Sequence, residues 1–209
     1  MDLAAASDLD LLRAWAAADR RAGDVLMRRH YTAVHRFMAL KATEAADDLT
    51  QQVLLACVEN AAAAAKATSF RAYLFGIARH KLLDHLRRSQ RVQVLATLPF
   101  DAPQTDLSPS RIVRMRREHR LLLRALETLP PDALVALQLF YGEELSTSEV
   151  AGALEISVSA VTTRLTRARA RLREQVESLE SDPATRTKLL ADVESWTVSL
   201  FERVRGAPP

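Results

Sequence analysis

The chain has 209 residues and a formal net charge of +3, and 48% of its residues are hydrophobic while only 5 are glycine. This length holds one large domain or two small ones. Alanine and leucine dominate, and few stretches alternate with a period of two, so the composition predicts an all-α protein of two small helical domains and disfavours β structure.

Composition also narrows the function classes. Cys57 is the only cysteine, which excludes an intramolecular disulfide and a cysteine-based zinc site. The first residues lack a basic start, and no apolar stretch reaches the roughly 20 residues that span a bilayer. We therefore expect a cytoplasmic protein without membrane insertion, and we predict neither a metal nor any other cofactor.

Residues 8–91 are predicted to form the first domain from four helices. The first helix begins after Ser7, which forms a capping-box pattern with Asp10. A second helix begins at about Asp19. The residues expected inside these two helices are Leu9, Leu12 and Ala16, followed by Leu26, His30, Val34, Phe37 and Met38.

The third and fourth helices complete this domain. We expect the third to run from about Ala45 through the alanine run that ends at Ala65, and the fourth from Phe70 to about Arg91. The expected buried residues are Leu49, Val53 and Cys57 in the third helix, and Phe70, Leu74, Ile77, Leu82 and Leu86 in the fourth.

Residues 92–110 contain three prolines and no basic side chain after Arg91, so they are predicted to be an extended linker. The second domain is predicted over 111–178, with a helix to Leu129 that Pro130 and Pro131 end. A C-terminal extension over 179–209 should contain a helix from Asp182 to about Val204. Its apolar stripe could dock on the second domain, dimerise or bind a regulator.

The segment LSTSEVAGALEISVSAVTTRLTRARARL predicts two helices joined by a tight turn. Ser146 and Glu149 form a capping box for the first helix, and Ser157 can cap the second. One face of the pair is apolar, and it comprises Val150, Leu154, Ile156, Val158, Val161, Leu165, Ala168 and Leu172. This is the spacing of a helix-turn-helix, although an ordinary helical hairpin would share it.

The outer face of the second helix carries short polar side chains followed by arginines. A helix that enters the major groove by its N-terminal end places short polar groups at the bases and arginines at phosphates or guanines. The predicted DNA-binding residues are Ser159, Thr162, Thr163, Arg164, Arg167 and Arg169.

Two segments resemble the sigma-70 family of RNA polymerase sigma factors, in particular the extracytoplasmic-function (ECF) group. Residues 129–174 resemble region four of that family, and residues 46–88, with ADDLTQQVLLACVEN and FRAYLFGIARHKLLDHLRR, resemble region two. The resemblance implies an alternative sigma factor without catalytic residues. Its implied partners are core RNA polymerase, the minus-ten and minus-thirty-five elements of promoter DNA, and an anti-sigma factor.

The resemblance also assigns roles to positions in the first domain. It implies polymerase contacts by Asp48, Gln51 and Gln52, which otherwise read as a polar helix face. It implies minus-ten contacts by Tyr73, Arg79, His80, Arg87 and Arg88, because aromatic and basic side chains suit unpaired bases and phosphates. Phe75 could serve either packing or base contact.

Departures from the family pattern affect promoter specificity. The loop before Phe70 reads AAAAAKATS and lacks the usual aromatic, arginine and glycine. His80 stands where asparagine is common, Thr162 where a basic residue is frequent, and Glu155 where the turn often has a small residue. We expect this chain to prefer a different promoter sequence.

Two other functions are alternatives to a sigma factor. A stand-alone helix-turn-helix regulator would use the same motif but would not need residues 46–88. An enzyme is disfavoured because the sequence has no glycine-rich phosphate loop, metal-ligand cluster or nucleophile paired with a base. For the free protein we expect the two domains to fold against each other and hide both DNA-binding faces.

Overall fold

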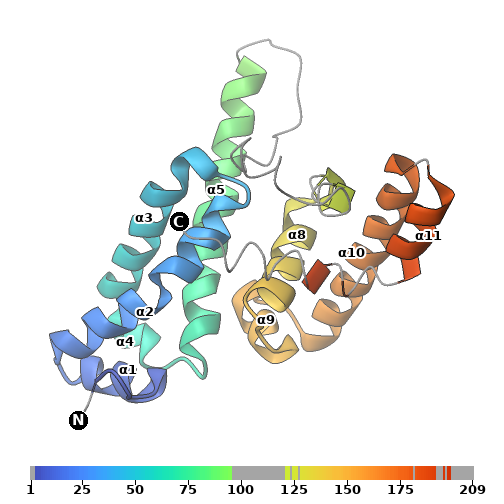
Figure 1. Cartoon of the computed structure of the whole chain (residues 1–209). Coiled ribbons are helices and arrows are strands. Elements are labelled where there is room, and N and C mark those ends of the chain that lie inside the picture. Colours follow the sequence, from blue (N-terminus) through green and yellow to red (C-terminus); the bar gives the residue numbers. More distant parts are fainter. Residues whose placement is uncertain are drawn as a thin grey trace.

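The computed structural model describes residues 3–95, 121–122, 124–126, 128–180, 182–191, 195 and 197–198. All regular elements in this part of the chain are helical, as the composition predicts. The N-terminal helices form one group and the C-terminal helices form a second group beside it (Figure 1). No helix among these residues is long and apolar enough to cross a membrane.

The first domain packs its helices around one apolar core. Its elements are α1 (Asp8–Ala16), α2 (Arg20–Ala39), η1 (Thr43–Ala45), α3 (Ala46–Glu59), α4 (Ala61–Ala64) and α5 (Phe70–Leu95). Ser7 caps α1 with its side chain, as predicted, and Asp19, at the expected start of the second helix, caps α2. The inner residues predicted for α2 and α3 are all buried, so both helices face the core as expected.

Several details of this domain differ from the prediction. Leu9 is 45% exposed, and Leu11 and Leu12 form the inner face of α1 because that helix is rotated toward α2. The third predicted helix is interrupted at Asn60, whose side-chain amide donates to the carbonyl of Ala56 and competes with helix propagation. α4 is therefore a separate turn.

The long helix α5 also differs at its ends and along its inner face. It continues to Leu95, four residues into the predicted linker, because the prolines that stop a helix come later. Phe75 is fully buried and packs edge-on against Phe37, whereas Ile77 and Leu86 are only half-buried. Residues 96–110 of the predicted linker lie outside the described residues.

The second domain is built from α8 (Pro131–Leu137), α9 (Thr147–Leu154) and α10 (Val158–Leu179), with α11 (Pro183–Ala191) packed against α10. The described residues between 121 and 126 are helical, and the rest of the helix predicted from 111 lies largely outside the description. Leu190 and Val198 pack against the core, which agrees with docking of the extension on its own chain. Residues 199–209 are not described.

A π-helical turn, η2 (Gln138–Gly142), follows directly after α8. The periodicity of the sequence does not predict it, because both helix types place apolar residues on the same side over one turn. Such turns widen a helix by one residue and often occur at functional positions. Glu143 follows this turn directly and lies buried between the two domains.

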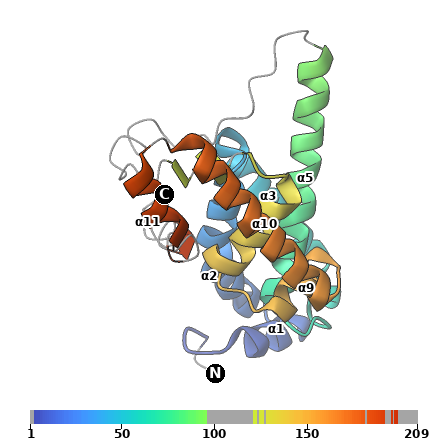
Figure 2. The ribbon, with the colours of Figure 1, turned by 90° about the vertical axis from the view of Figure 1, so that its right-hand side faces the viewer.

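The two domains pack directly against each other. One continuous cluster of buried apolar residues includes members from both, and α9 lies along α5 (Figures 1 and 2). The two helices are close at Gly152 and Gly76, where a β-carbon would lie in ordinary van der Waals contact with Ala72 and with the backbone of Ala153. The two domains are thus closed on each other, as expected, but the expectation that both DNA-binding faces would be hidden is wrong for α10, because Ser159, Thr162, Thr163 and Arg167 are exposed.

Candidate nucleic-acid interface

The corner between α9 and α10 has the geometry of a helix-turn-helix. Ser146 accepts from the amide of Glu149 at 3.2 Å, and Glu149 accepts from the amide of Ser146 at 3.0 Å, so the predicted capping box is formed. Glu155 ends α9 in the left-handed conformation at φ 55°. Ser157 then caps α10 by accepting from the amide of Ala160.

The backbone conformation at Glu155 suits a glutamate less well than the small residue often found at this turn. The left-handed region disfavours side chains with a Cβ, so Glu155 strains the corner modestly. The apolar residues on both sides hold the turn: Val150, Leu154, Val161 and Leu165 are buried, and Ile156 packs against them. Val158, predicted to join this stripe, is instead 47% exposed because it stands at the first, outward position of α10.

The outward face of α10 is polar and accessible. Ser159, Thr162, Thr163 and Arg167 are all exposed. The hydroxyls of Thr162 and Thr163 donate to carbonyls one turn earlier, which orders the side chains on the helix surface. These four predicted residues therefore lie together on one free surface.

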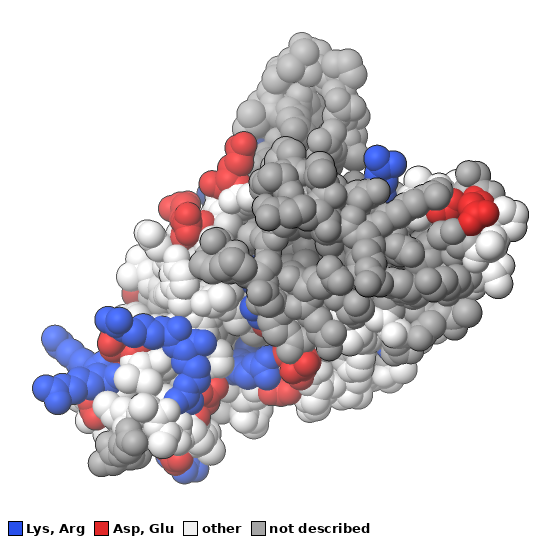
Figure 3. Space-filling view, viewed as in Figure 1, with Lys and Arg blue, Asp and Glu red and all other residues white. Residues whose placement is uncertain are grey.

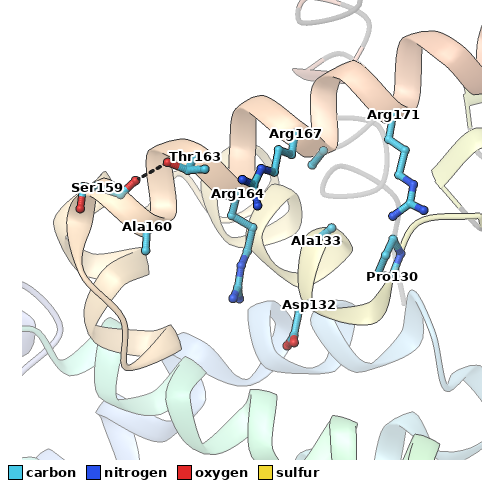
Figure 4. Close-up of a pocket in the computed structure, with 10 residues that line it drawn as sticks. Pro130, Asp132, Ala133, Ser159, Ala160, Thr163, Arg164, Arg167 and Arg171 are labelled. Carbon is cyan, nitrogen blue, oxygen red and sulfur yellow. Dashed lines mark hydrogen bonds between the residues drawn. The ribbon is translucent and has the colours of Figure 1, made fainter.

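A groove of about 580 Å³ runs beside this face, between α8 and α10. Its lining includes Ser159, Thr163, Arg164, Arg167, Arg171 and Asp132 (Figure 4). Arg164 points from α10 toward Asp132 and the first domain, and its Nη1 atom is buried without a hydrogen-bond partner among the described residues. The groove thus gathers cationic side chains of α10 within the second domain.

Arg169 lies apart from the other predicted DNA-binding residues. It is half-buried, donates from Nε to the hydroxyl of Tyr141 at 2.7 Å, and lies over the rings of Phe140 and Tyr141. Such contacts stabilise a side chain against its own domain. In this structure Arg169 supports the helix-turn-helix from behind.

The predicted minus-ten residues divide between two parts of α5. Tyr73 is half-buried, and burial raises the pKa of its hydroxyl. Arg79 lies 3.5 Å from Asp132 and His80 lies 3.6 Å from Glu155, so both face the second domain. Arg87 and Arg88 are exposed further along the helix, where Arg87 pairs with Asp84.

The predicted polymerase-binding residues share one outer side of α3. Asp48 and Gln51 are exposed, and Gln52 donates to the carboxylate of Asp48 at 2.7 Å. Leu55 and Val58 continue this side of the helix and are 57% and 49% exposed. We did not single out these two residues from the sequence, although a leucine seven positions after Asp48 falls on the same helical face.

Charge is unevenly spread on the surface. In the view of Figure 3, Lys and Arg side chains gather over the end of the first domain that carries α1 and α2, interspersed with Asp and Glu. Arg28 and Asp24 form one such exposed pair at 3.0 Å. The alternation there is typical of a solvated helix face, in contrast to the arginines of α10 that lack acidic neighbours on the helix before Glu174.

Comparison with known proteins identifies the family. Residues 26–92 match the model of sigma-70 region 2, and residues 119–172 match the model of sigma-70 region 4. The chain belongs to the sigma-70 family. It is 31% identical over 169 residues to the ECF RNA polymerase sigma factor SigM of Mycobacterium tuberculosis, which covers 79% of this chain and 83% of that protein.

Solved structures agree with this sigma factor in fold. A structure of CnrH in complex with the cytosolic domain of CnrY is similar with a TM-score of 0.57 and 24% identity, over 82% of this chain and 97% of that chain. The sigma factor RpoE of Bartonella quintana, in complex with the anti-sigma factor NepR, gives a TM-score of 0.58 and 21% identity, over 76% and 97%.

The protein is thus an alternative sigma factor of the ECF group that directs transcription initiation. Sigma factors are generally regulatory proteins without catalysis. One matched segment lies in each helical group: the region 2 match runs from within α2 to within α5, and the region 4 match ends within α10. The roles of individual residues in α3, α5 and α10 remain predictions.

Proposed function

We propose that this sigma factor binds core RNA polymerase through α3, contacts the minus-ten element through α5 and reads the minus-thirty-five element through α10. The outward face of α10 carries the proposal. Its exposed hydroxyls and Arg167 follow a capped helix N-terminus at a formed helix-turn-helix, which is the arrangement that suits entry into a major groove.

The side chains on α10 fit a division of labour in DNA recognition. Ser159, Thr162 and Thr163 are short and stand in the first turns, close enough to contact base edges or flanking phosphates. Arg167 stands a turn later and suits a phosphate or a guanine. Arg164, which lines the groove between α8 and α10 and points toward the first domain here, becomes available to DNA once the domains separate.

The first domain supplies the other two contacts. On α5, Tyr73 with Arg79, His80, Arg87 and Arg88 combines an aromatic ring with positive charge, which suits unpaired bases and their phosphates. On α3, the polar residues Asp48, Gln51 and Gln52 adjoin exposed Leu55 and Val58. A polar rim beside apolar side chains is typical of protein interfaces, so we assign this face to polymerase.

We further propose that the protein acts in the cytoplasm, has no catalytic activity of its own and is held inactive by an anti-sigma factor. The structural relative RpoE is described in complex with such a factor, NepR. The groove between α8 and α10 and the exposed face of α3 are the surfaces that we assign to such an inhibitor.

The direct test is run-off transcription with purified core RNA polymerase on fragmented DNA of the source genome, with and without this protein. An Arg164→Ala plus Arg167→Ala variant tests α10, and an Asp48→Ala plus Gln52→Ala variant tests α3. We expect new start sites with the wild-type protein. The α10 variant should bind core but lose them, and the α3 variant should fail to bind core.

A matched control is Arg28→Ala, which removes an arginine that is exposed on α2 and pairs with Asp24 one turn earlier. This variant should start transcription at the wild-type sites. If the wild-type protein neither binds core nor creates start sites, but binds specific duplex DNA alone, the sigma-factor assignment fails and a stand-alone regulator replaces it.

A further inference from the structure

One buried ion pair joins the two domains. Arg36 on α2 donates from Nε and Nη2 to the two carboxylate oxygens of Glu143, at 3.2 and 2.7 Å. The side chains are only 15% and 3% exposed. Such a bidentate pair fixes the relative orientation of both groups, and its loss removes two charge-assisted hydrogen bonds from a largely buried site.

Hydrogen bonds surround this pair on both sides. Arg71 at the start of α5 donates to the backbone carbonyl of Glu143. The side-chain amide of Gln138, at the beginning of the π-helical turn, donates to the backbone carbonyl of Phe37 at 3.1 Å. Gln138 is 2% exposed, so this bond forms away from water and its loss would be unfavourable.

The first helix of the helix-turn-helix is also held by the first domain. Ser69 donates to Glu149 at 2.8 Å, and Glu149 simultaneously completes the capping box of α9. Burial would raise the pKa of Glu149, but hydrogen bonds from Ser146 and Ser69 outweigh it and lower the pKa. Glu149 therefore remains a charged acceptor shared by both domains.

Carboxylates of the second domain face the predicted minus-ten cations. Asp132 lies beside Arg79, whose side chain is only 16% exposed, and Glu155 lies beside His80. A DNA phosphate cannot take the place of Asp132 beside Arg79 in this arrangement, whereas His80 and Glu155 are 57% and 71% exposed, so their contact covers α5 only partly. The closed arrangement consequently withdraws part of α5 from DNA.

We propose that the Arg36–Glu143 ion pair is an interdomain latch that holds the free sigma factor closed, with Asp132 and Glu155 standing in for DNA phosphates at Arg79 and His80. That closure inhibits promoter binding rests on the proposed function. Activation then requires the latch to break, which core polymerase achieves by binding each domain separately and thereby stabilising the open state.

The test measures the distance between the domains in the full-length protein without polymerase or DNA. Donor and acceptor dyes are attached at Lys66→Cys in the first domain and Glu177→Cys in the second, both exposed positions. The native Cys57 is fully buried, which protects it from labelling. We expect one high-efficiency transfer population for the wild-type protein.

A double-mutant cycle isolates the latch. Arg36→Met and Glu143→Gln should each shift the ratio of open to closed molecules roughly tenfold or more, because each removes the bidentate contact between the domains. The combined variant should shift no further than either single variant, since the two effects are not additive within one ion pair. The matched control, Arg28→Met with Asp24→Asn, breaks an exposed pair on the same helix and should leave the ratio unchanged.

Three results would overturn the latch: a wild-type protein with separated domains, single variants that remain closed, or single effects that add in the combined variant. Circular dichroism checks that each variant keeps its helices. If a single variant unfolds, the combined variant, which has no unpaired charge, still decides the question.

A second arm addresses inhibition. Variants that open should associate with core polymerase several-fold faster than the wild type and use the same start sites. Open variants with unchanged association would contradict an inhibitory role. If no protein, wild type included, supports transcription, the proposed function fails while the distance measurement still decides whether the latch exists.

Discussion

The two helices assigned to DNA, α5 and α10, are exposed to different extents in the same structure. On α10 Ser159, Thr162, Thr163 and Arg167 are exposed, and the helix packs behind them through the buried Val161, Leu165, Ala168 and Leu172. On α5 the predicted residues are divided, because Tyr73 is half-buried and Arg79 and His80 face carboxylates of the second domain. The closed protein therefore presents one DNA-binding surface and covers part of the other.

This difference indicates the order of events in promoter recognition. A surface that is already free can bind duplex DNA as soon as it meets it, whereas a covered surface acts only after a conformational change. Minus-ten contacts by Arg79 and His80 should follow domain separation. Variants of both helices test this difference in exposure.

Substitution of Phe75 tests whether this residue of α5 packs in the core. The ring is fully buried against Phe37, so Phe75→Ala should lower the free energy of unfolding by about 3–5 kcal/mol. Thermal denaturation measures this change. Tyr73→Phe is the control, since it keeps the ring and should change stability little; equal losses for both variants would contradict the assignment of Phe75 to the core.

Arg169 and Arg167 sharpen the contrast within α10. Arg169→Ala should lower stability by about 1–2 kcal/mol, because it removes a hydrogen bond to Tyr141 and a cation–π contact. Arg167→Ala should leave stability unchanged and reduce the salt dependence of promoter binding by about one unit of slope. Binding titrations over a salt series, with chemical denaturation, distinguish the two, and a reversed pattern would exchange their roles.

Removal of the capping box tests whether the exposed surface of α10 depends on the stability of α9. Ser146→Ala should destabilise the second domain by about 1 kcal/mol, because the amide of Glu149 loses its acceptor. Hydrogen exchange of α9 amides would report the loss locally. Ser159→Ala changes an exposed serine at the start of α10 and should leave this exchange unaltered.

A further prediction concerns the stability of the protein at low pH, where the contact between Asp8 of α1 and His30 matters. A hydrogen bond with His30 lowers the pKa of Asp8 to about 2, against the opposing effect of burial. Since this folded value lies below the usual 3.8, the pairing stabilises the protein above that pH, and the contribution is lost as the pH falls toward 2. Asp8→Asn should flatten this part of the stability profile; an unchanged profile would show that the pair contributes nothing.

Local patterns predicted much of the fold correctly. Ser7, Asp19, Ser146 and Ser157 all cap helices where their side chains suggest, because capping depends on a few neighbouring residues. The inner residues of α2 follow directly from their spacing. The helix-turn-helix could be placed for the same reason.

Features that depend on tertiary contacts could not be predicted. Leu9 has the right spacing for the core, but the packing of α1 on α2 turns it outward. Arg169 belongs to a basic run, and only the position of Tyr141 shows that it packs inward. Arg36 and Glu143 are 107 residues apart, and nothing in either local sequence indicates that they pair.

The packing of the two domains also has a consequence for how strong their contact needs to be. Because one chain carries both domains, each experiences the other at an effective concentration that is on the order of millimolar for a short connection. A contact whose affinity between separate domains is no better than about millimolar would already keep half of the molecules closed. The Arg36–Glu143 contact can therefore be weak by the standards of protein complexes, which leaves polymerase able to open the molecule by ordinary mass action.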